Sequence, residues 1–405
     1  MFSRLSRLLP QSFKNLYHLF VAVAANFYYS FPARSLIVIG VTGTDGKTTT
    51  SHLIHHFLEA SGYKAALIST VSAKIGDTEI DTGFHVTSPD PWPLQKLLRR
   101  IVAQNYGYVV LETTSHGLHQ HRFWGVPFRI GVLTNVSLEH LDYHHTPSSY
   151  LKAKAKLFRH ARHAVLNQDD PNSYSYIKTL LPPKISLHPY SLRAIPPTLL
   201  RSLKDRFKEP FNQENGLAAA TAANLLGVSE ESISHALTAF PGVPGRLEEI
   251  PNPYHFTTIV DFAHTPNGLK RTLTALKKRR PKGKKLIAVF GAAGLRDKSK
   301  RPLMGEIGSL LADIIILTAE DPRTENVADI ISQIRAGAKG PAGILIEPDR
   351  QKAIDLAIVN LARPGDIVAV LGKGHEQSMC FGTIESPWSD HEAIRKALAQ
   401  KKSPA

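Results

Sequence analysis

The chain has 405 residues, 42% hydrophobic and 20% charged, so it can bury more than one core and is not disordered as a whole. Its one cysteine, Cys380, excludes a disulfide framework and a cysteine-rich zinc site. The 49 basic and 34 acidic residues give a net charge of +15, which favours anionic partners without choosing among nucleotides, phosphorylated substrates, nucleic acid and acidic membranes. At about 100–200 residues per domain, this length predicts two or three domains.

Residues 1–34 form a basic, aromatic N-terminal segment. No acidic residue precedes Asp45, and His18 and Asn26 interrupt the apolar run. The run is shorter than the roughly 20 apolar residues of a membrane-spanning helix, and the absence of a convincing small-residue cleavage site argues against a secretory signal. Two interpretations stay open: an amphipathic helix packed on the next domain, or one that lies on an anionic membrane surface. A true anchor is the remaining alternative.

Short apolar strands alternate with helical segments over residues 35–243, which predicts a parallel sheet with crossover helices. The expected strands are 35–41, 65–70, 108–112 and 130–134, and the expected helices are 48–60 and 150–162. Proline and glycine concentrate at 240–246, which predicts a domain boundary. Residues 244–405 then form a second α/β domain, with strands at 257–261, 286–291, 314–318 and 367–371 and helices at 266–278 and 327–336.

The first strand runs into the sequence TGTDGKTT at 42–49, just ahead of a helix. Glycines let backbone N–H groups approach phosphate oxygens, Lys47 and the helix N-terminus add positive charge, and the Thr48 hydroxyl suits Mg²⁺. Val41 replaces the first glycine of the usual phosphate loop, so this is a shortened variant. The pattern predicts an α/β P-loop domain, with a ligand-free turn as the alternative. The loop alone does not separate a kinase, a motor, a GTPase and a ligase.

Further polar residues follow the neighbouring strands. Glu112 ends strand 108–112, where a carboxylate beside a phosphate loop suits Mg²⁺. Residues 113–122 supply hydrogen-bonding groups for an anionic, hydroxyl-rich substrate, and a neutral imidazole at His140 suits a metal. By spacing alone, the three lysines within 150–158 are a solvated helix face, and nothing singles out the middle one.

Together these segments resemble the Mur ligase family, which are ATP-dependent, ADP-forming amide-bond ligases that add amino acids to a peptidoglycan precursor. The most similar branch is that of the UDP-N-acetylmuramoyl-tripeptide synthetases. The segments that carry the resemblance, in family order, are GVTGTDGKTTT, LETTSHGLHQHR, TNVSLEHLDYHHT, YLKAKAKLF, FNQENGLAAA, GVPGRLEEI, VDFAHTPNGL, FGAAGLRDKSKRPLMG, EDPRTE and GKGHE. They run from about residue 35 to the C-terminus, so the resemblance is far more specific than one loop. It implies a central P-loop ATPase domain followed by a Rossmann-like ligase domain.

The resemblance implies roles for individual residues. The catalytic set would be Lys47, Glu112, His140 and Lys154, and the ligands of two Mg²⁺ ions would be Thr48, Glu112, His140 and Lys154. Lys154 matches the family's carbamylated lysine, in which added CO₂ turns the amine into a carboxylate that can bind a metal. The implied ATP contacts are Gly43, Thr44, Asp45, Gly46, Lys47, Thr48, Thr49, Asn135, Asn215, Arg246, Asp261 and His264. The implied acceptor contacts are Thr87, Ser88, Thr114, Ser115, Gln120 and Arg122.

The implied contacts of the incoming amino acid lie in the second domain: Arg296, Glu320, Asp321, Pro322, Arg323, Gly372 and Glu376. An arginine can clamp a carboxylate with two hydrogen bonds, so Arg323 favours an amino acid with a distal carboxylate. Meso-diaminopimelate is one candidate. The family's diaminopimelate branch usually has Asp-Asn where this chain has Glu320 and Asp321, so the identity of the amino acid stays open.

Typical members carry roughly a hundred residues that recognise the UDP group before the first strand, a domain's worth, whereas this strand is expected from residue 35. The resemblance therefore leaves both a UDP-linked and a lipid-linked muramoyl-peptide acceptor open. The expected partners are this acceptor and a free amino acid, with peripheral membrane contact through residues 1–34 as an alternative. No nucleic acid is expected, because the basic run 277–285 has no interleaved aromatic residues and suits a solvated helix end and loop. A cytoplasmic monomer is implied.

In the implied reaction, a substrate carboxylate attacks the γ-phosphoryl group of ATP, and the amine of the amino acid then displaces phosphate from the acyl phosphate. Three alternatives remain: a folylpolyglutamate- or cyanophycin-type ligase, a non-catalytic nucleotide-sensing subunit, and a basic nucleic-acid ATPase. The segments SHGLHQHR and GKGHE favour the muramoyl-peptide branch over folate enzymes. The presence of Lys47, Glu112, His140 and Lys154 argues against lost activity.

Overall fold

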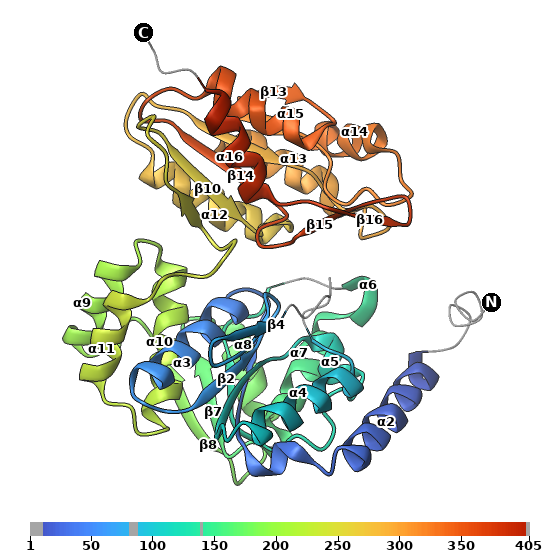
Figure 1. The fold of residues 1–405 in the computed structure, drawn as a ribbon, viewed down its shortest axis with the longest axis vertical. Helices are drawn as coiled ribbons and strands as arrows, with labels where there is room; N and C mark the ends of the chain where they lie inside the picture. Colours follow the sequence, from blue (N-terminus) through green and yellow to red (C-terminus); the bar gives the residue numbers. More distant parts are fainter. Residues whose placement is uncertain (1–10, 81–87, 138–140, 402–405) are drawn as a thin grey trace. The chain divides into compact units, whose positions relative to one another are not determined.

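The computed structural model describes residues 11–80, 88–137 and 141–401. The chain divides into two compact units, the first ending at Pro241 and the second beginning at Gly242. Each unit is a layered α/β structure built on its own sheet (Figure 1). The α/β fold class predicted from the alternating pattern is therefore confirmed.

The described part of the first unit holds an eight-stranded sheet in the order β4-β3-β2-β5-β1-β6-β7-β8. In this order the strands β2, β5, β1, β6, β7 and β8 are parallel to one another. Strands β3 and β4 form an antiparallel edge. The bounds are β1 (Ile37–Thr42), β2 (Ala65–Ile68), β3 (Ala73–Ile75), β4 (Thr78–Ile80), β5 (Tyr108–Glu112), β6 (Phe128–Leu133), β7 (His163–Asn167) and β8 (Ser186–Tyr190). The central strands are apolar along their length because helices cover both faces.

Helices connect these strands. Their bounds are α2 (Gln11–Tyr28), α3 (Lys47–Ala60), α4 (Pro91–Ala103), α5 (Ser115–His119), α6 (Leu141–His144), α7 (Pro147–Ala155), α8 (Pro171–Thr179), α9 (Pro197–Arg206), α10 (Pro210–Asn224) and α11 (Glu230–Ala239). Proline opens α4 and each of α7 to α10, because its fixed φ suits the first helical turn and its missing N–H is not needed there. Among the described residues, none of the helices has the length and apolarity needed to cross a bilayer.

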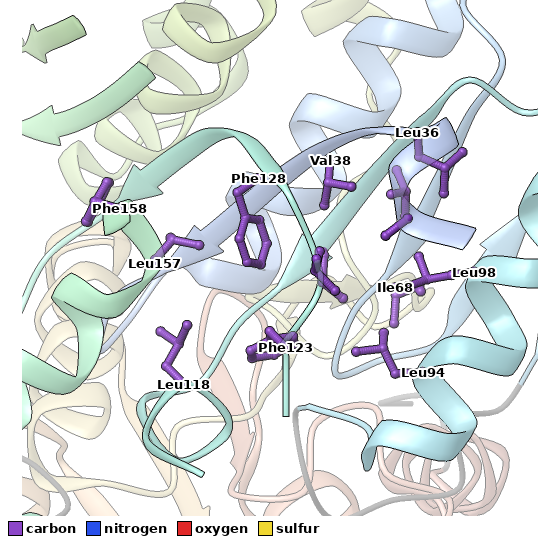
Figure 2. Packing of buried hydrophobic residues seen from close by; sticks show 14 of the residues in the cluster. Leu36, Val38, Ile68, Leu94, Leu98, Leu118, Phe123, Phe128, Leu157 and Phe158 are labelled. Carbon is purple, nitrogen blue, oxygen red and sulfur yellow. The ribbon is translucent and has the colours of Figure 1, made fainter. Parts of the chain in front are cut away.

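One face of the first sheet packs against α4 and the segment after α5. Val38 and Phe128 from the sheet meet Leu94 and Leu98 from α4 in one buried cluster (Figure 2). The α4 residues lie four apart and so share one helix face. This packing holds the strands in place, and with them the loops at their carboxyl ends.

The second unit has a six-stranded sheet in the order β13-β12-β11-β14-β10-β9, in which only β9 is antiparallel, and a separate hairpin. The strands are β9 (Glu248–Ile250), β10 (Thr257–Asp261), β11 (Leu286–Phe290), β12 (Ile314–Leu317), β13 (Gly343–Ile346) and β14 (Ile367–Leu371), with the hairpin strands β15 (Ser378–Phe381) and β16 (Ile384–Pro387). The helices are α12 (Pro266–Arg279), α13 (Lys300–Leu311), α14 (Val327–Gly337), α15 (Arg350–Asp355) and α16 (Asp390–Gln400).

Several element boundaries differ from the sequence expectation, and two of the differences have a clear cause. Strand β1 begins two residues later than predicted because Pro32–Ser35 form a 3₁₀ turn ahead of it. The helix expected at 150–162 is α7, opened three residues earlier by Pro147, followed by a separate 3₁₀ helix at Lys156–His160. The basic run at 277–285 is the end of α12 and the loop before β11, as predicted.

Candidate active site

The phosphate-loop sequence lies at the carboxyl end of β1, between β5 and β6. Asn135, which follows β6, holds this loop from one side. Its backbone oxygen accepts a hydrogen bond from Thr44 N at 2.8 Å, and its side chain accepts from Asp45 N at 3.1 Å and donates to Asp45 O at 3.0 Å. The loop conformation is therefore set by the protein itself, before any ligand binds.

Two glycines of the loop cannot be replaced without strain. A Cβ on Gly43 would lie 1.8 Å from Thr134 Oγ1, and one on Gly46 would lie 2.1 Å from Asn215 Oδ1. Gly46 also has a φ of +80°, which side chains rarely adopt. The buried Asn215, on α10, thus packs directly against the turn into α3.

Positive charge gathers where the loop meets α3. Gly46 is the N-cap residue of α3, and no side chain caps the helix. Lys47 Nζ donates to the backbone oxygens of Gly43 at 3.2 Å and Thr44 at 2.8 Å, which holds the ammonium group over the loop. A long helix with an uncapped N-terminus and an adjacent lysine is an arrangement that binds phosphate.

Glu112 and Thr48 meet at the next strand end. The β1–β5 register pairs Val41 with Glu112, and Thr48 Oγ1 donates to Glu112 Oε1 at 3.1 Å. Glu112 is 1% exposed, and its other oxygen accepts from Thr70 N at 3.0 Å. A buried hydroxyl and carboxylate are oxygen ligands of the kind Mg²⁺ prefers, so these residues fit the ion.

The second predicted metal site is only partly covered by the described residues. His140 lies outside the described residues. Within the residues that are described, there is no cluster of three or more His, Cys, Asp or Glu side chains suited to hold a metal. A metal held by Thr48 and Glu112 would need further ligands of another kind, such as phosphate oxygens.

Lys154 does not lie on a solvated helix face, so that expectation is wrong for this lysine. It is 1% exposed, whereas Lys152 on the same helix is exposed. Its Nζ donates to Gly43 O at 2.6 Å and lies 4.4 Å from the centre of the Tyr150 ring. Helix α7 packs this face towards the phosphate loop, and a carbonyl and an aromatic face offset the cost of burying the amine.

Tyr150 is a site residue that the sequence interpretation missed. Its hydroxyl is 3.0 Å from Thr44 Oγ1, so it contacts the loop from the same helix as Lys154. The signal was present in the spacing, because residues 150 and 154 are four apart and share a helix face.

Four of the predicted acceptor contacts form one hydrogen-bonded network. Ser88 Oγ and Thr114 Oγ1 are 2.9 Å apart, and Arg122 donates to Ser88 O at 2.8 Å and to Gln120 Oε1 at 2.9 Å. Thr114 also caps α5. The fifth, Ser115, is 3.0 Å from His144 Nε2. Thr87 lies outside the described residues.

Aromatic and imidazole rings line the side of this network. The Tyr143 hydroxyl accepts from Gln120 Nε2 at 3.2 Å and lies 3.1 Å from His119 Nδ1. Burial, together with His116 and His119, lowers the pKa of His144 to about 3, so its ring is neutral at physiological pH. Neutral rings can stack and hydrogen-bond without adding charge to the site.

The predicted nucleotide contacts of the second unit lie together at the end of β10. Asp261 accepts hydrogen bonds from Leu247 N at 2.7 Å, Ala263 N at 3.0 Å and Thr272 Oγ1 at 3.0 Å. Burial raises the pKa of Asp261, while Arg246 and these bonds oppose the shift. Because both carboxylate oxygens are engaged within the chain, Asp261 positions the neighbouring backbone.

Arg246 and His264 flank this carboxylate. The Arg246 guanidinium lies 4.4 Å from the centre of the Phe262 ring. His264 Nδ1 is 2.8 Å from Phe262 O, and burial together with Lys300 lowers its pKa to about 4. His264 is therefore neutral at physiological pH.

The predicted amino-acid contacts meet around Lys373, which the sequence interpretation did not single out. The buried Lys373 Nζ lies 2.9 Å from Asp321 Oδ1 and 2.5 Å from Glu376 Oε2. Asp321 Oδ1 also accepts from Cys380 N at 3.0 Å. Asp321 is thus engaged by its own chain. Its position in the family motif carried no sign of this, because the lysine is about 50 residues away in sequence.

Glu320, unlike the neighbouring Asp321, has a carboxylate oxygen that is not engaged by the described part of the chain. It is 5% exposed, and Oε2 has no hydrogen-bond partner among the described residues. Burial raises the pKa of Glu320 to about 7, although Lys300 and Lys373 oppose the shift. A buried carboxylate with an unsatisfied oxygen is a group that a ligand's ammonium can complete.

Arg323 follows this carboxylate pair and is held by the β15–β16 hairpin. Its N–H donates to Cys380 O at 3.0 Å, and its oxygen accepts from Gly382 N at 2.7 Å. Arg296 is exposed on the loop after β11. A cavity of about 420 Å³ beside the hairpin contains none of the predicted contacts and is lined by Val327, Pro348, Asp349, Arg350, Met379, Phe381, Ser386, Pro387 and Trp388.

Comparison with known proteins identifies both units. Residues 41–200 match the Mur ligase middle domain, and residues 245–374 match the glutamate ligase domain of Mur ligases. The UDP-N-acetylmuramyl-tripeptide synthetase of Roseiflexus sp. is 38% identical over 94% of this chain and 82% of its own length. The UDP-N-acetylmuramoyl-L-alanyl-D-glutamate–2,6-diaminopimelate ligase of Synechococcus elongatus is 40% identical over 94% of this chain and 80% of its own length.

Solved structures give the same result. A UDP-N-acetylmuramoyl-L-alanyl-D-glutamate–2,6-diaminopimelate ligase matches with a TM-score of 0.59 and 30% identity, over 90% of this chain and 78% of its own. The folylpolyglutamate synthase of Mycobacterium tuberculosis, complexed with ADP, has a TM-score of 0.70 at 16% identity, over 87% of this chain and 91% of its own. At that identity the likeness concerns the fold alone.

Proposed function

This chain belongs to the Mur ligase family, and from that premise we propose that it couples an amino acid to a muramoyl-peptide acceptor through an acyl phosphate. Family membership makes it an ADP-forming acid–amino-acid ligase of peptidoglycan synthesis that binds a nucleotide. The observation that carries the proposal is the arrangement around Gly43: Lys47 and Lys154 both donate to its backbone oxygen, and Thr48 of α3 donates to Glu112 at the end of the adjoining strand.

In the first step, an acceptor carboxylate oxygen attacks the γ-phosphorus of ATP, and ADP leaves. The uncapped N-terminus of α3 and the Lys47 ammonium bind the phosphates and offset the charge that builds on their oxygens. Asn135 keeps the loop in this geometry. The network of Ser88, Thr114, Gln120 and Arg122 is suited to orient the anionic acceptor.

Thr48 and Glu112 would hold one Mg²⁺ ion, and a carbamylated Lys154 with His140 would hold a second. When bound, the ions neutralise phosphate charge. The burial of Lys154 beside the loop supports its assignment, since a carboxylate made by adding CO₂ to this amine would lie next to the phosphate-binding turn.

In the second step, the amino acid's amine attacks the acyl carbon, phosphate leaves and the amine loses a proton. Arg323 is suited to bind a distal carboxylate of the amino acid, and Glu320 is suited to bind an ammonium group. An amino acid with both groups, such as meso-diaminopimelate, fits this pair better than one that carries only an ammonium group.

A phosphate-release screen tests the proposal. UDP-linked and lipid-linked muramoyl-peptide acceptors are crossed with diaminopimelate, lysine and other amino acids, and ADP and the coupled product are measured. We expect phosphate release that needs both an acceptor and one amino acid, and we expect Lys47→Ala to abolish it. Turnover with a folate acceptor instead, or ATP hydrolysis without coupling, would contradict the proposal.

A further inference from the structure

Helix α2 buries small residues and exposes large apolar ones. Ala22, Ala25 and Asn26 face the protein and are fully buried. The exposed residues, 62–72% accessible, are Phe13, Leu16, Tyr17, Phe20, Phe27 and Tyr28. At 100° per residue these six positions fall within about 120° of one another, so they form one continuous face, here called the aromatic stripe. An ordinary surface helix has the opposite arrangement.

The stripe is held by the folded body of the first unit. Helix α2 packs on α4 at one side of the unit (Figure 1). Asn26 Nδ2 donates to Trp124 O at 2.7 Å, and a Cβ on Gly125 would lie 2.5 Å from Asn26 Oδ1, so the contact is close. The stripe therefore faces outwards because α2 is fixed by its other side.

Further aromatic residues extend the stripe beyond the helix. The Trp92 ring lies 5.3 Å from that of Tyr28 and is 40% exposed, and Trp124 is 37% exposed. Tryptophan and tyrosine combine an apolar ring with a polar edge, a combination favoured at the boundary between lipid chains and head groups. A patch of this composition suits a lipid surface.

The charge of this segment favours one kind of binding partner for the stripe over another. The first 44 residues contain no aspartate or glutamate, and Lys14 on α2 and Arg34 just after it are the basic residues of this segment that the structure describes. A second copy of the chain on a two-fold axis would bring these like charges together, which disfavours self-association. An anionic lipid surface offers both the apolar layer for the rings and the negative charge for the basic residues.

We propose that the aromatic stripe docks the first unit on an anionic lipid membrane, with α2 lying in the plane of the head groups. The same helix reaches the predicted acceptor site, because Gln11 Nε2 donates to Tyr143 OH at 2.9 Å and Tyr143 contacts Gln120. Docking therefore brings that site close to the lipid surface, where a lipid-linked acceptor would be found. This last step rests on the proposed function, whereas the docking does not.

Vesicle flotation of the full chain tests the docking. The vesicles contain phosphatidylglycerol and phosphatidylcholine in equal parts, or phosphatidylcholine alone. We expect binding to the anionic vesicles only, weakened by high salt. The double variant Leu16→Ser/Phe20→Ser should lower the bound fraction about tenfold or more, since two exposed apolar side chains no longer enter the lipid. The control Ile384→Ser removes an equally exposed apolar residue, 70% accessible, in the second unit and should bind like the parent chain.

Three results would overturn the docking: no flotation of the parent chain with anionic vesicles, equal flotation with both kinds of vesicle, or equal flotation of parent and double variant. A parent dimer that the double variant converts to a monomer, without lipid binding, would assign the stripe to self-association instead. Circular dichroism and phosphate release with a soluble acceptor should be unchanged in the double variant. A loss of lipid binding with activity retained thus separates the docking from the proposed function.

Discussion

At the carboxyl edge of the first sheet, Lys47 is held by backbone carbonyl oxygens, whereas at the same edge of the second sheet Lys373 is held by two carboxylates. Carbonyl contacts leave the net charge of Lys47 in place, so it can attract phosphate. Despite burial, Glu376 and Asp321 raise the pKa of Lys373, and their negative charges balance its positive charge. The first edge is thus suited to an anion, and the second keeps an additional buried carboxylate, Glu320, whose unpaired oxygen is suited to a cation.

Among the variants that test this comparison, Lys154→Met should have the largest effect on turnover. It removes the second amine at the Gly43 carbonyl, and we expect turnover to fall about 100- to 1000-fold, as for the loss of other groups that stabilise charge in a transition state. Lys152→Met, an exposed lysine on the same helix, should leave turnover unchanged.

The same pair of variants tests carbamylation. If Lys154 carries CO₂, added bicarbonate should raise the activity of the parent chain and of Lys152→Met, and not that of Lys154→Met. Activity that does not respond to bicarbonate, with no carbamate mass on the intact protein, would refute the modification. Thermal unfolding of each variant separates lost chemistry from lost folding.

Gly46→Ala should have the next largest effect, on nucleotide binding. The new Cβ meets Asn215 Oδ1 at 2.1 Å in a left-handed conformation, which together cost about 2–5 kcal/mol and predict an ATP affinity roughly 100-fold weaker. Gly62→Ala is the matched control, since its φ is +83° and nothing lies within 4 Å. It should cost some stability and leave ATP affinity intact, measured by calorimetry. Equal affinities for both variants would show that the loop is not the nucleotide site.

Glu320 gives the second edge a pH dependence. With a pKa of about 7, its carboxylate is mostly protonated at pH 6 and mostly ionised at pH 8, so the KM for an amino acid bound through its ammonium should fall about tenfold over that range. Glu320→Gln should abolish this part of the profile. A KM profile identical in the parent chain and the variant would exclude Glu320 from the amino-acid site.

The same residue affects folding stability with a defined sign. Its folded pKa is raised above the unfolded value of 4.5, so the folded state binds the proton more tightly. Stability therefore falls as the pH rises from about 4.5 to 7, and changes no further from this source above that. Glu320→Gln should flatten the corresponding part of a stability profile from urea unfolding.

Asp321→Asn should have the smallest effect on activity and sharpen the contrast between the two edges. Because Asp321 is engaged by Lys373 and Cys380 N, the substitution should change the KM for the amino acid by no more than about twofold. It weakens a buried ion pair that retains Glu376, so we expect a loss of about 1–3 kcal/mol in unfolding free energy. A large KM change at full stability would mean that Asp321 contacts the amino acid directly.

Much of the fold and of the candidate site was predictable because its signals are local. Apolar runs such as 108–112 and 367–371 are strands with the predicted bounds, and the glycine turn before α3 has the expected strand–loop–helix context. The position of Glu112 beside the loop followed from its place at a strand end, since parallel strands bring their carboxyl ends to one edge.

The sequence alone determined central strands such as 108–112 and 367–371 and the glycine-rich turn before α3, because periodicity and turn chemistry act over a few residues. Only the tertiary structure decided which partner each long side chain takes: Lys154 turned in to Gly43, and Asp321 paired with Lys373. It also decided that α2 presents its aromatic face to the outside. These outcomes depend on contacts between residues far apart in the chain, and the hydrophobic spacing of one helix does not say which neighbour will cover it.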